Sequence, residues 1–332
     1  MRFFPIIAVV GGFATMGYPQ PAPAPAPAPL ALSAALQECD DEELQEAAMN
    51  ALLQMDSERA MPILVKVLER RDECSLKLRR KAVFVVAQQE IEGTEEILLR
   101  VARTDPDEGV REQAVFWLSQ VPGDGAVSAL DSILIGSQVR AIQEKAIFAL
   151  AQHESSRAHQ ILRDYVERAD QPVELREKAI FWLGNEGSGA DQAYLRELYS
   201  RIESRTLKEK IIFAAAQSDA AENRDWLLAV AGDANETMEV RKRALFWVAQ
   251  RDDVSVADLK ALYDGAAEPE MKRQVLFGLS QRDESQAVDQ LMEIARSETD
   301  VDLRRKAVFW LGQTDDPRAA EFLLQIINQE VQ

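Results

Sequence analysis

Residues 303–314 read LRRKAVFWLGQT, and this twelve-residue sequence recurs with small changes along most of the 332-residue chain. Two close copies are VREQAVFWLSQV at residues 110–121 and LREKAIFWLGNE at residues 175–186, and a degenerate copy begins at Leu44. Self-similarity at a fixed period is the signature of a repeat architecture. The central phenylalanine recurs every 31 to 33 residues, at Phe84, Phe116, Phe148, Phe181, Phe213, Phe246, Phe277 and Phe309.

A second amphipathic segment follows each copy after a short turn rich in Asp, Gly, Ser and Glu. Residues 126–134, 158–166 and 319–327 are examples. Each repeat is therefore a helical hairpin whose apolar face needs a neighbour to cover it, and stacking buries a continuous core. We predict an all-α fold, a right-handed α-solenoid of about nine hairpins, forming one domain over residues 35–332.

The repeated positions resemble the HEAT-like, armadillo-like helical family, in particular the short repeats of the phycobilin-lyase type, over about residues 40–330. The resemblance implies an α/α superhelix in which the Phe-bearing helix lines the concave wall. It also implies that the basic residue five before Phe bridges to loop carbonyls and to acids such as Asp107 or Asp300. The resemblance is carried by Val110, Arg111, Ala114, Leu118 and Ser119, by Leu175, Arg176, Ala179, Leu183 and Gly184, and by Leu303, Arg304, Ala307, Leu311 and Gly312.

The Phe lies on the polar side of its helix. At 100° per residue, the Ala two before Phe and the aliphatic residue two after it point to the core, whereas charged residues and an amide share the Phe face. Eight rings could expose about 1,200 Å² of apolar surface, more than the about 300–600 Å² patches of typical monomers. The predicted partner-binding residues are Phe116, Phe148, Phe181, Phe213, Phe246, Gln120, Gln152, Asn185, Gln217, Lys145, Lys178, Glu144 and Glu177.

Two interpretations of this face stay open. Each ring can tuck beneath the next repeat, with Glu and Lys side chains over it and the amides capping helix ends. Alternatively, the rings anchor a bound protein or peptide, with amides that bond its backbone. The residue after Phe alternates between a small residue and Trp, so that Trp117, Trp182, Trp247 and Trp310 recur every second repeat. We interpret this alternation as interlocking core packing.

The amino terminus predicts export. Residues 1–17, MRFFPIIAVVGGFATMG, hold one Arg and an apolar stretch too short to span a bilayer comfortably, as in a signal peptide. Residues 18–34 form a Pro/Ala-rich linker. We expect a periplasmic or secreted protein without a further transmembrane span, although an uncleaved signal could anchor it. Cys39 and Cys74 occupy near-equivalent points of the first two hairpins, so they either form a disulfide there or stay free.

Composition argues against several function classes. With 56 acidic and 38 basic residues, the net charge of −18 disfavours a nucleic-acid groove. His153 and His159 do not have the spacing of a metal pair. We therefore expect no enzyme, no catalytic residue, no metal and no cofactor, but a monomeric scaffold that binds an unidentified protein or peptide. Alternatives are an accessory subunit for a small ligand, by analogy with phycobilin lyases, and a self-associating solenoid aided by Phe322 and Ile326.

Overall fold

The computed structural model describes residues 42–72, 74–89 and 91–328. Within these residues the chain forms eighteen α-helices and no strand. The odd-numbered helices are α1 (Glu42–Leu53), α3 (Ser75–Ala87), α5 (Glu108–Leu118), α7 (Arg140–Gln152), α9 (Val173–Asn185), α11 (Arg205–Ala216), α13 (Met238–Val248), α15 (Pro269–Ser280) and α17 (Val301–Leu311). The even-numbered helices are α2 (Ser57–Leu68), α4 (Thr94–Thr104), α6 (Asp124–Gly136), α8 (Ser156–Glu167), α10 (Gly189–Arg201), α12 (Ala221–Gly232), α14 (Val256–Gly265), α16 (Ser285–Ser297) and α18 (Pro317–Ile327).

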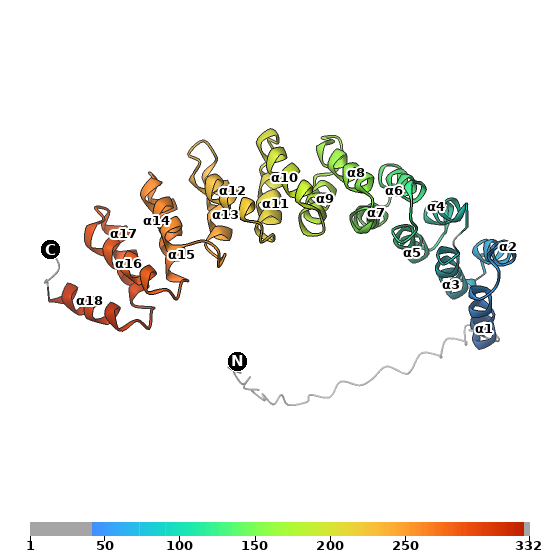
Figure 1. Cartoon of the computed structure of the whole chain (residues 1–332), viewed down its shortest axis with the longest axis horizontal. Coiled ribbons are helices and arrows are strands. Elements are labelled where there is room, and N and C mark those ends of the chain that lie inside the picture. Colours follow the sequence, from blue (N-terminus) through green and yellow to red (C-terminus); the bar gives the residue numbers. More distant parts are fainter. Residues whose placement is uncertain (1–41, 73, 90, 329–332) are drawn as a thin grey trace, which may run out of the picture. The chain divides into compact units, whose positions relative to one another are not determined.

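The helices form nine consecutive hairpins, arranged as two layers (Figure 1). From α3 to α17 each odd-numbered helix contacts the next odd-numbered one, and several even-numbered helices contact each other in the same way. The predicted α-solenoid is thus confirmed, and the Phe-bearing helices form one layer. The predicted signal peptide (1–17), the linker (18–34) and residues 35–41 lie outside the described residues.

The core follows the repeated pattern. In α5 the leading Val110, Ala114 and Leu118 are fully buried, as predicted from the helical period. The small residue three after Phe permits close approach between repeats. At Gly184 of α9, an added Cβ would collide with the Cβ of Ala214 in α11, the next helix of the same layer. A larger residue at this position would push the two repeats apart.

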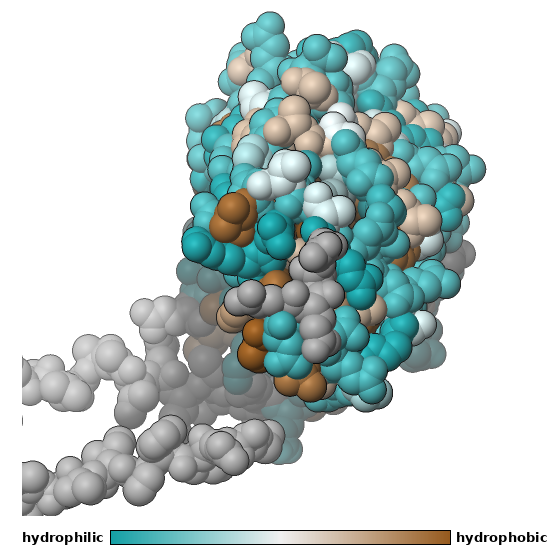
Figure 2. Space-filling view, turned by 90° about the vertical axis from the view of Figure 1, so that its left-hand side faces the viewer, coloured by the Kyte–Doolittle hydropathy of each residue, from teal (hydrophilic) through white to brown (hydrophobic). Residues whose placement is uncertain are grey.

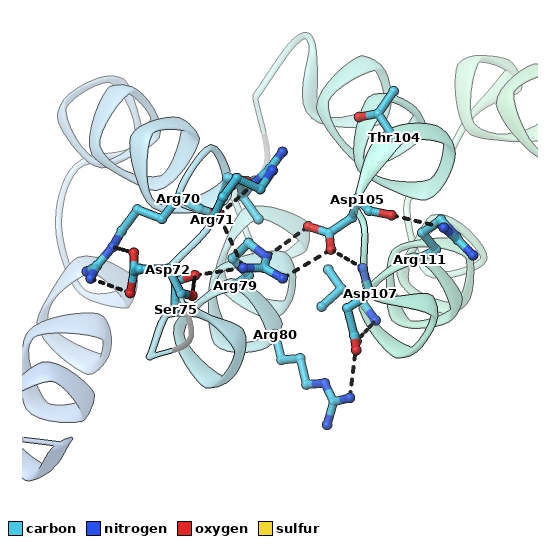
Figure 3. A network of polar contacts seen from close by, with 12 residues as sticks. Arg70, Arg71, Asp72, Ser75, Arg79, Arg80, Thr104, Asp105, Asp107 and Arg111 are labelled. Carbon is cyan, nitrogen blue, oxygen red and sulfur yellow. Dashed lines mark hydrogen bonds and ion pairs between the residues drawn. The ribbon is translucent and has the colours of Figure 1, made fainter. Parts of the chain in front are cut away.

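The basic residue five before Phe joins neighbouring repeats, and Figure 3 shows its first example. The Arg79 guanidinium donates to Asp105 Oδ2 (2.9 Å) and to Ser75 Oγ (2.7 Å). Arg79 and Asp105 are both buried. The interaction therefore ties α3 to the turn that begins the next repeat, where each buried charge is neutralised by the other.

The prediction that Asp107 and Asp300 accept from the basic row was wrong, because the acids that do so lie two residues earlier, at Asp105 and Glu298. Asp107 Oδ1 accepts from the backbone N–H of Val110 (2.9 Å) and from Arg80 (3.2 Å), because it is the N-cap of α5. Asp300 caps α17 in the same way, while Glu298 accepts from Lys272 (2.9 Å).

The rest of the row repeats this role, and Gln143, which lacks a charge, still donates to a carbonyl of the preceding helix. The contacts are Arg111 to Asp105 O, Gln143 to Leu134 O, Arg176 to Val166 O, Lys208 to Glu236, Arg241 to Ala231 O and Glu268, and Arg304 to Ala295 O.

Figure 2 views the molecule from the side where α18 lies, and most of this surface is hydrophilic, with separate hydrophobic residues. Phe322, which we expected to aid self-association, is 2% exposed and lies under the Arg296 guanidinium, 4.5 Å from the ring centroid. Its side chain fills the last hairpin and is therefore not available to a second copy. None of the described helices is both long and apolar enough to cross a bilayer.

Candidate partner-binding surface

The repeated phenylalanines lie on the solvent side of the odd-numbered layer. Phe116 and Phe309 are 40% and 50% exposed, and the other six rings are half-buried. All five predicted anchors, from Phe116 on α5 to Phe246 on α13, lie on consecutive helices of this layer. The structure therefore places the predicted anchors on one surface.

Each of the four tryptophans lies between two phenylalanines, one on its own helix and one on the preceding odd-numbered helix. The ring centroids are 4.9 to 5.7 Å apart, in edge-on or tilted geometry. Such arrangements are favourable for aromatic quadrupoles. We call the twelve rings the aromatic stripe; its four groups are Phe84–Trp117–Phe116, Phe148–Trp182–Phe181, Phe213–Trp247–Phe246 and Phe277–Trp310–Phe309.

The structure shows the ring packing that the first interpretation expects and the partial exposure that the second requires, and partner binding stays a prediction. The rings pack on one another across repeats, and they keep part of their surface in solvent. The prediction about the tryptophans needs a correction. The small partners, such as Ala149 and Ala214, are buried in the core, but the four tryptophans are only half-buried at its edge. An indole is too large for this layer, so it leans over the Phe of the preceding repeat.

Charged side chains cross the aromatic stripe from one repeat to the next. Glu112 pairs with Lys145 (3.4 Å) and Glu144 pairs with Lys178 (3.8 Å). The lysines of both pairs are about half exposed, so the pairs stabilise the fold little, by about 0–1 kcal/mol each, and they can exchange partners. Glu177 makes no ion pair within the described residues.

Other lysines lie over the rings themselves. Lys210 Nζ is 5.6 Å from the Phe213 centroid, and Lys306 Nζ is 4.5 Å from that of Phe309. These are cation–π distances. The cations therefore leave part of each ring open and place positive charge beside apolar surface.

The amides form a row at the carboxyl ends of the same helices. Gln120, Gln152, Asn185 and Gln217 are all exposed. Gln120 donates to Ser119 Oγ (2.9 Å) and Asn185 to Glu186 Oε1 (2.6 Å). None of these four side chains caps its own helix within the described residues, which differs from the structural interpretation. Their outward amides can bond a partner.

Cys39 lies outside the described residues, so the Cys39–Cys74 disulfide stays a prediction. Cys74, which is not a free cysteine, precedes α3.

A buried polar network in the other layer was missed by the sequence reasoning. Asp191 is 0% exposed and accepts from His159 (2.8 Å), Arg163 (2.8 Å) and Ser188 (2.9 Å). Burial alone would raise the pKa of the Asp191 carboxyl, but these hydrogen bonds outweigh it and lower the pKa below its ordinary value. An alignment of the even-numbered helices could have revealed this network, because Asp191 stands where α6, α8 and α16 carry a buried Ala, namely Ala126, Ala158 and Ala287.

Comparison with known proteins supports the repeat assignment. Residues 256–332, which include α14 to α18, match the family model of HEAT repeats. None of the curated proteins matches the chain. The resemblance to HEAT repeats predicted from the sequence is confirmed.

The solved structures that are similar to the chain at low sequence identity include the following three. The first is Escherichia coli YibA (TM-score 0.38, 13% identity, 81% of this chain and 97% of that one). The second is human deoxyhypusine hydroxylase in complex with glycerol (TM-score 0.32, 19% identity, 75% and 90%). The third is the complex of CpcE and CpcF of phycocyanin lyase from Nostoc sp. (TM-score 0.35, 16% identity, 78% and 94%).

Proposed function

We propose that this solenoid of HEAT-like hairpins is a non-enzymatic scaffold that binds a protein or peptide along its odd-numbered layer, the wall predicted to be concave. We place it in the periplasm or outside the cell, on the basis of the predicted signal peptide and linker. The single observation that carries the proposal is the aromatic stripe: ring packing across repeats already holds it in place, yet its rings remain partly in solvent.

The stripe has the parts of a peptide-binding surface. Aromatic rings give large contact area at low cost in conformational entropy, and rigid aromatic anchors dominate many interfaces. The exposed amides of Gln152 and Gln217 offer donors and acceptors for a peptide backbone. The alternating charges of Glu144 and Lys178 would orient a partner, because like charges brought together are repelled.

The proposal is tested by a double substitution at the centre of the stripe. Phe148→Ser with Phe181→Ser removes both rings that contact Trp182. The full-length protein is used to capture partners from the extracytoplasmic fraction of its source cells, and the captured proteins are quantified by mass spectrometry. We expect specific partners to fall at least about tenfold, as is typical when aromatic anchors are removed.

The matched control is Ile63→Ser with Ile135→Ser. These residues are 44% and 40% exposed on α2 and α6, in the other layer. Circular dichroism must show equal helix content in both variants. Equal capture by both would contradict the proposal, and loss of helix in the Phe variant alone would show that the stripe serves packing only.

A further inference from the structure

The fifth hairpin differs from its neighbours at the turn between α9 and α10. Residues 185–190 read NEGSGA, and an added Cβ at Gly187 would collide with the carbonyl of Leu183. In the even-numbered layer, Asp191 and Asn223 are both 0% exposed at points where α8 and α16 carry Ala. Two adjacent repeats have thus exchanged apolar core for polar groups, which costs stability unless each group has a partner.

A polar cleft of about 460 Å³ lies at this place, between the carboxyl ends of α9 and α11 and the amino ends of α10 and α12. The glycines of the turn leave room for it, because they carry no side chain. Its polar lining consists of Asn185, Gln192, Arg196, Gln217, Ser218 and Glu222. Asn185 and Gln217 are also members of the predicted amide row, so the cleft adjoins the proposed binding surface.

Arg196 supplies the positive charge of the cleft. Its guanidinium donates to Asn223 Oδ1, a neutral acceptor, and it makes no ion pair within the described residues. Half-buried arginines such as Arg176 and Arg282 also lack an ion pair within the described residues, but they donate to backbone carbonyls, whereas Arg196 donates to a side-chain amide. As the only cation among the residues that line the cleft, the Arg196 guanidinium has no carboxylate partner within the described residues. It therefore points to an anionic ligand.

The guanidinium is held in place by a chain of hydrogen bonds. Asn223 Nδ2 donates to Gln192 Oε1 (2.8 Å), and Gln192 Nε2 donates to the backbone carbonyl of Gly184 (2.5 Å). Both amide residues are buried. Such support fixes the donor before a ligand arrives, which lowers the entropic cost of binding.

We propose that this cleft binds a carboxylate, with Arg196 as its charged donor and the amides of Asn185 and Gln217 as further donors. Arg–carboxylate pairs are strong because the planar guanidinium can donate two parallel hydrogen bonds. Glu222 at the rim disfavours a bare dianion and favours a ligand that has an N–H donor beside its carboxylate. The carboxyl terminus of a peptide fits this description, and this choice of occupant rests on the proposed peptide-binding function.

The test uses nuclear magnetic resonance of the full-length, isotope-labelled protein. The probes are acetyl-Ala-Ala-Ala with a free carboxyl terminus, the same tripeptide ending in an amide, and sodium acetate. The free-acid tripeptide should shift the side-chain signals of Arg196, Asn185 and Gln217, and the amide form should bind about tenfold more weakly or worse. If acetate shifts the same signals at the same concentration as the free-acid tripeptide, the ligand is a small free carboxylate. If only the free-acid tripeptide shifts them, the ligand is the carboxyl terminus of a peptide.

Two substitutions locate the effect. Arg196→Gln should abolish the shifts, whereas Arg224→Gln, the same change at an exposed ion pair on α12, should not. Asn185→Ala alters only an exposed side chain and should weaken binding severalfold with unchanged helix content. Equal binding of acid and amide tripeptides, undiminished binding by Arg196→Gln or Asn185→Ala, or no shift with any probe would overturn the site. Failure of the carboxylate site would not change the expected loss of captured partners in the Phe148→Ser, Phe181→Ser variant. The two proposals can therefore fail independently.

Discussion

The indole of Trp182 contacts Phe148 and Phe181, which belong to successive repeats. One residue thus closes the interface between two hairpins on the solvent side. The alternate interface has no such indole, because Ala149 and Ala214 stand at the equivalent points. The indoles therefore join the repeats in pairs, and small residues allow the pairs to approach; Phe181 and Phe213 also stack across one interface between pairs, with ring centroids 6.2 Å apart.

Ala149→Trp tests this pairing. Ala149 is 0% exposed in α7, so an indole there must displace packed neighbours, and we expect a loss of about 1–3 kcal/mol in the free energy of unfolding. Urea titration followed by circular dichroism measures the loss. The control is Ala229→Trp on the exposed face of α12, where an indole meets solvent. Equal stability of the two variants would show that the layer at Ala149 has room for a ring.

At the scale of the element, the carboxylate of Glu298 joins three helices. It accepts from Tyr263 Oη (2.7 Å) in α14 and from Lys272 Nζ (2.9 Å) in α15, and it precedes α17. Burial raises the pKa of this carboxyl, but the hydrogen bonds from Tyr263, Lys272 and the backbone of Asp300 outweigh burial and bring the pKa down to about 2. The junction depends on the ionised form.

Because the folded-state pKa of Glu298 lies below its ordinary value of 4.5, its contribution to stability is complete above pH 4.5. The contribution is lost as the pH falls from 4.5 to about 2. Glu298→Gln should therefore lower the free energy of unfolding at neutral pH and flatten its decline over this interval. Denaturant titrations at several pH values measure both effects. Glu293→Gln on the exposed side of α16 is the control, and it should leave the pH profile unchanged.

At the scale of the whole molecule, the repeated positions predicted the fold because every hairpin buries the same apolar positions against its neighbours. Val110, Ala114 and Leu118 are buried where the helical period placed them, and Phe116, on the polar face of its helix, is 40% exposed. The acidic partner of Arg79 could not be predicted in this way. Both Asp105 and Asp107 lie in the turn before α5, so the sequence allows either of them to pair with Arg79. The backbone conformation at the start of α5 makes Asp107 the N-cap and leaves Asp105 to pair with Arg79.

The cleft beside Arg196 escaped prediction for a different reason. The even-numbered helices share less sequence than the odd-numbered ones, so Asp191 and Asn223 do not stand out until the helices are aligned by their burial. Departures from the repeat mark the cleft, whereas the repeated positions serve the stacking that every hairpin needs and also form the aromatic stripe.

The stacked architecture also predicts how the chain unfolds. In a linear array, stability is a sum of repeat terms and nearest-neighbour interface terms, so a weakened interface can uncouple the two sides. Arg241 is 3% exposed and joins α13 to the next hairpin through Glu268 (2.9 Å). Arg241→Met removes this link and leaves α15 to α18 as two hairpins, fewer than the three or more repeats that such folds need.

We therefore expect Arg241→Met to expose α15 to α18 to hydrogen exchange at urea concentrations where α3 to α11 remain protected. Mass spectrometry of the exchanged peptides measures protection helix by helix. The control is Arg304→Met. Among the described residues, the Arg304 side chain on α17 bonds only to the Ala295 carbonyl (3.2 Å), so its loss should affect the last hairpin alone. Uniform loss of protection along the array in Arg241→Met would mean that the coupling extends beyond neighbouring repeats, because a single weakened interface would then destabilise every hairpin equally.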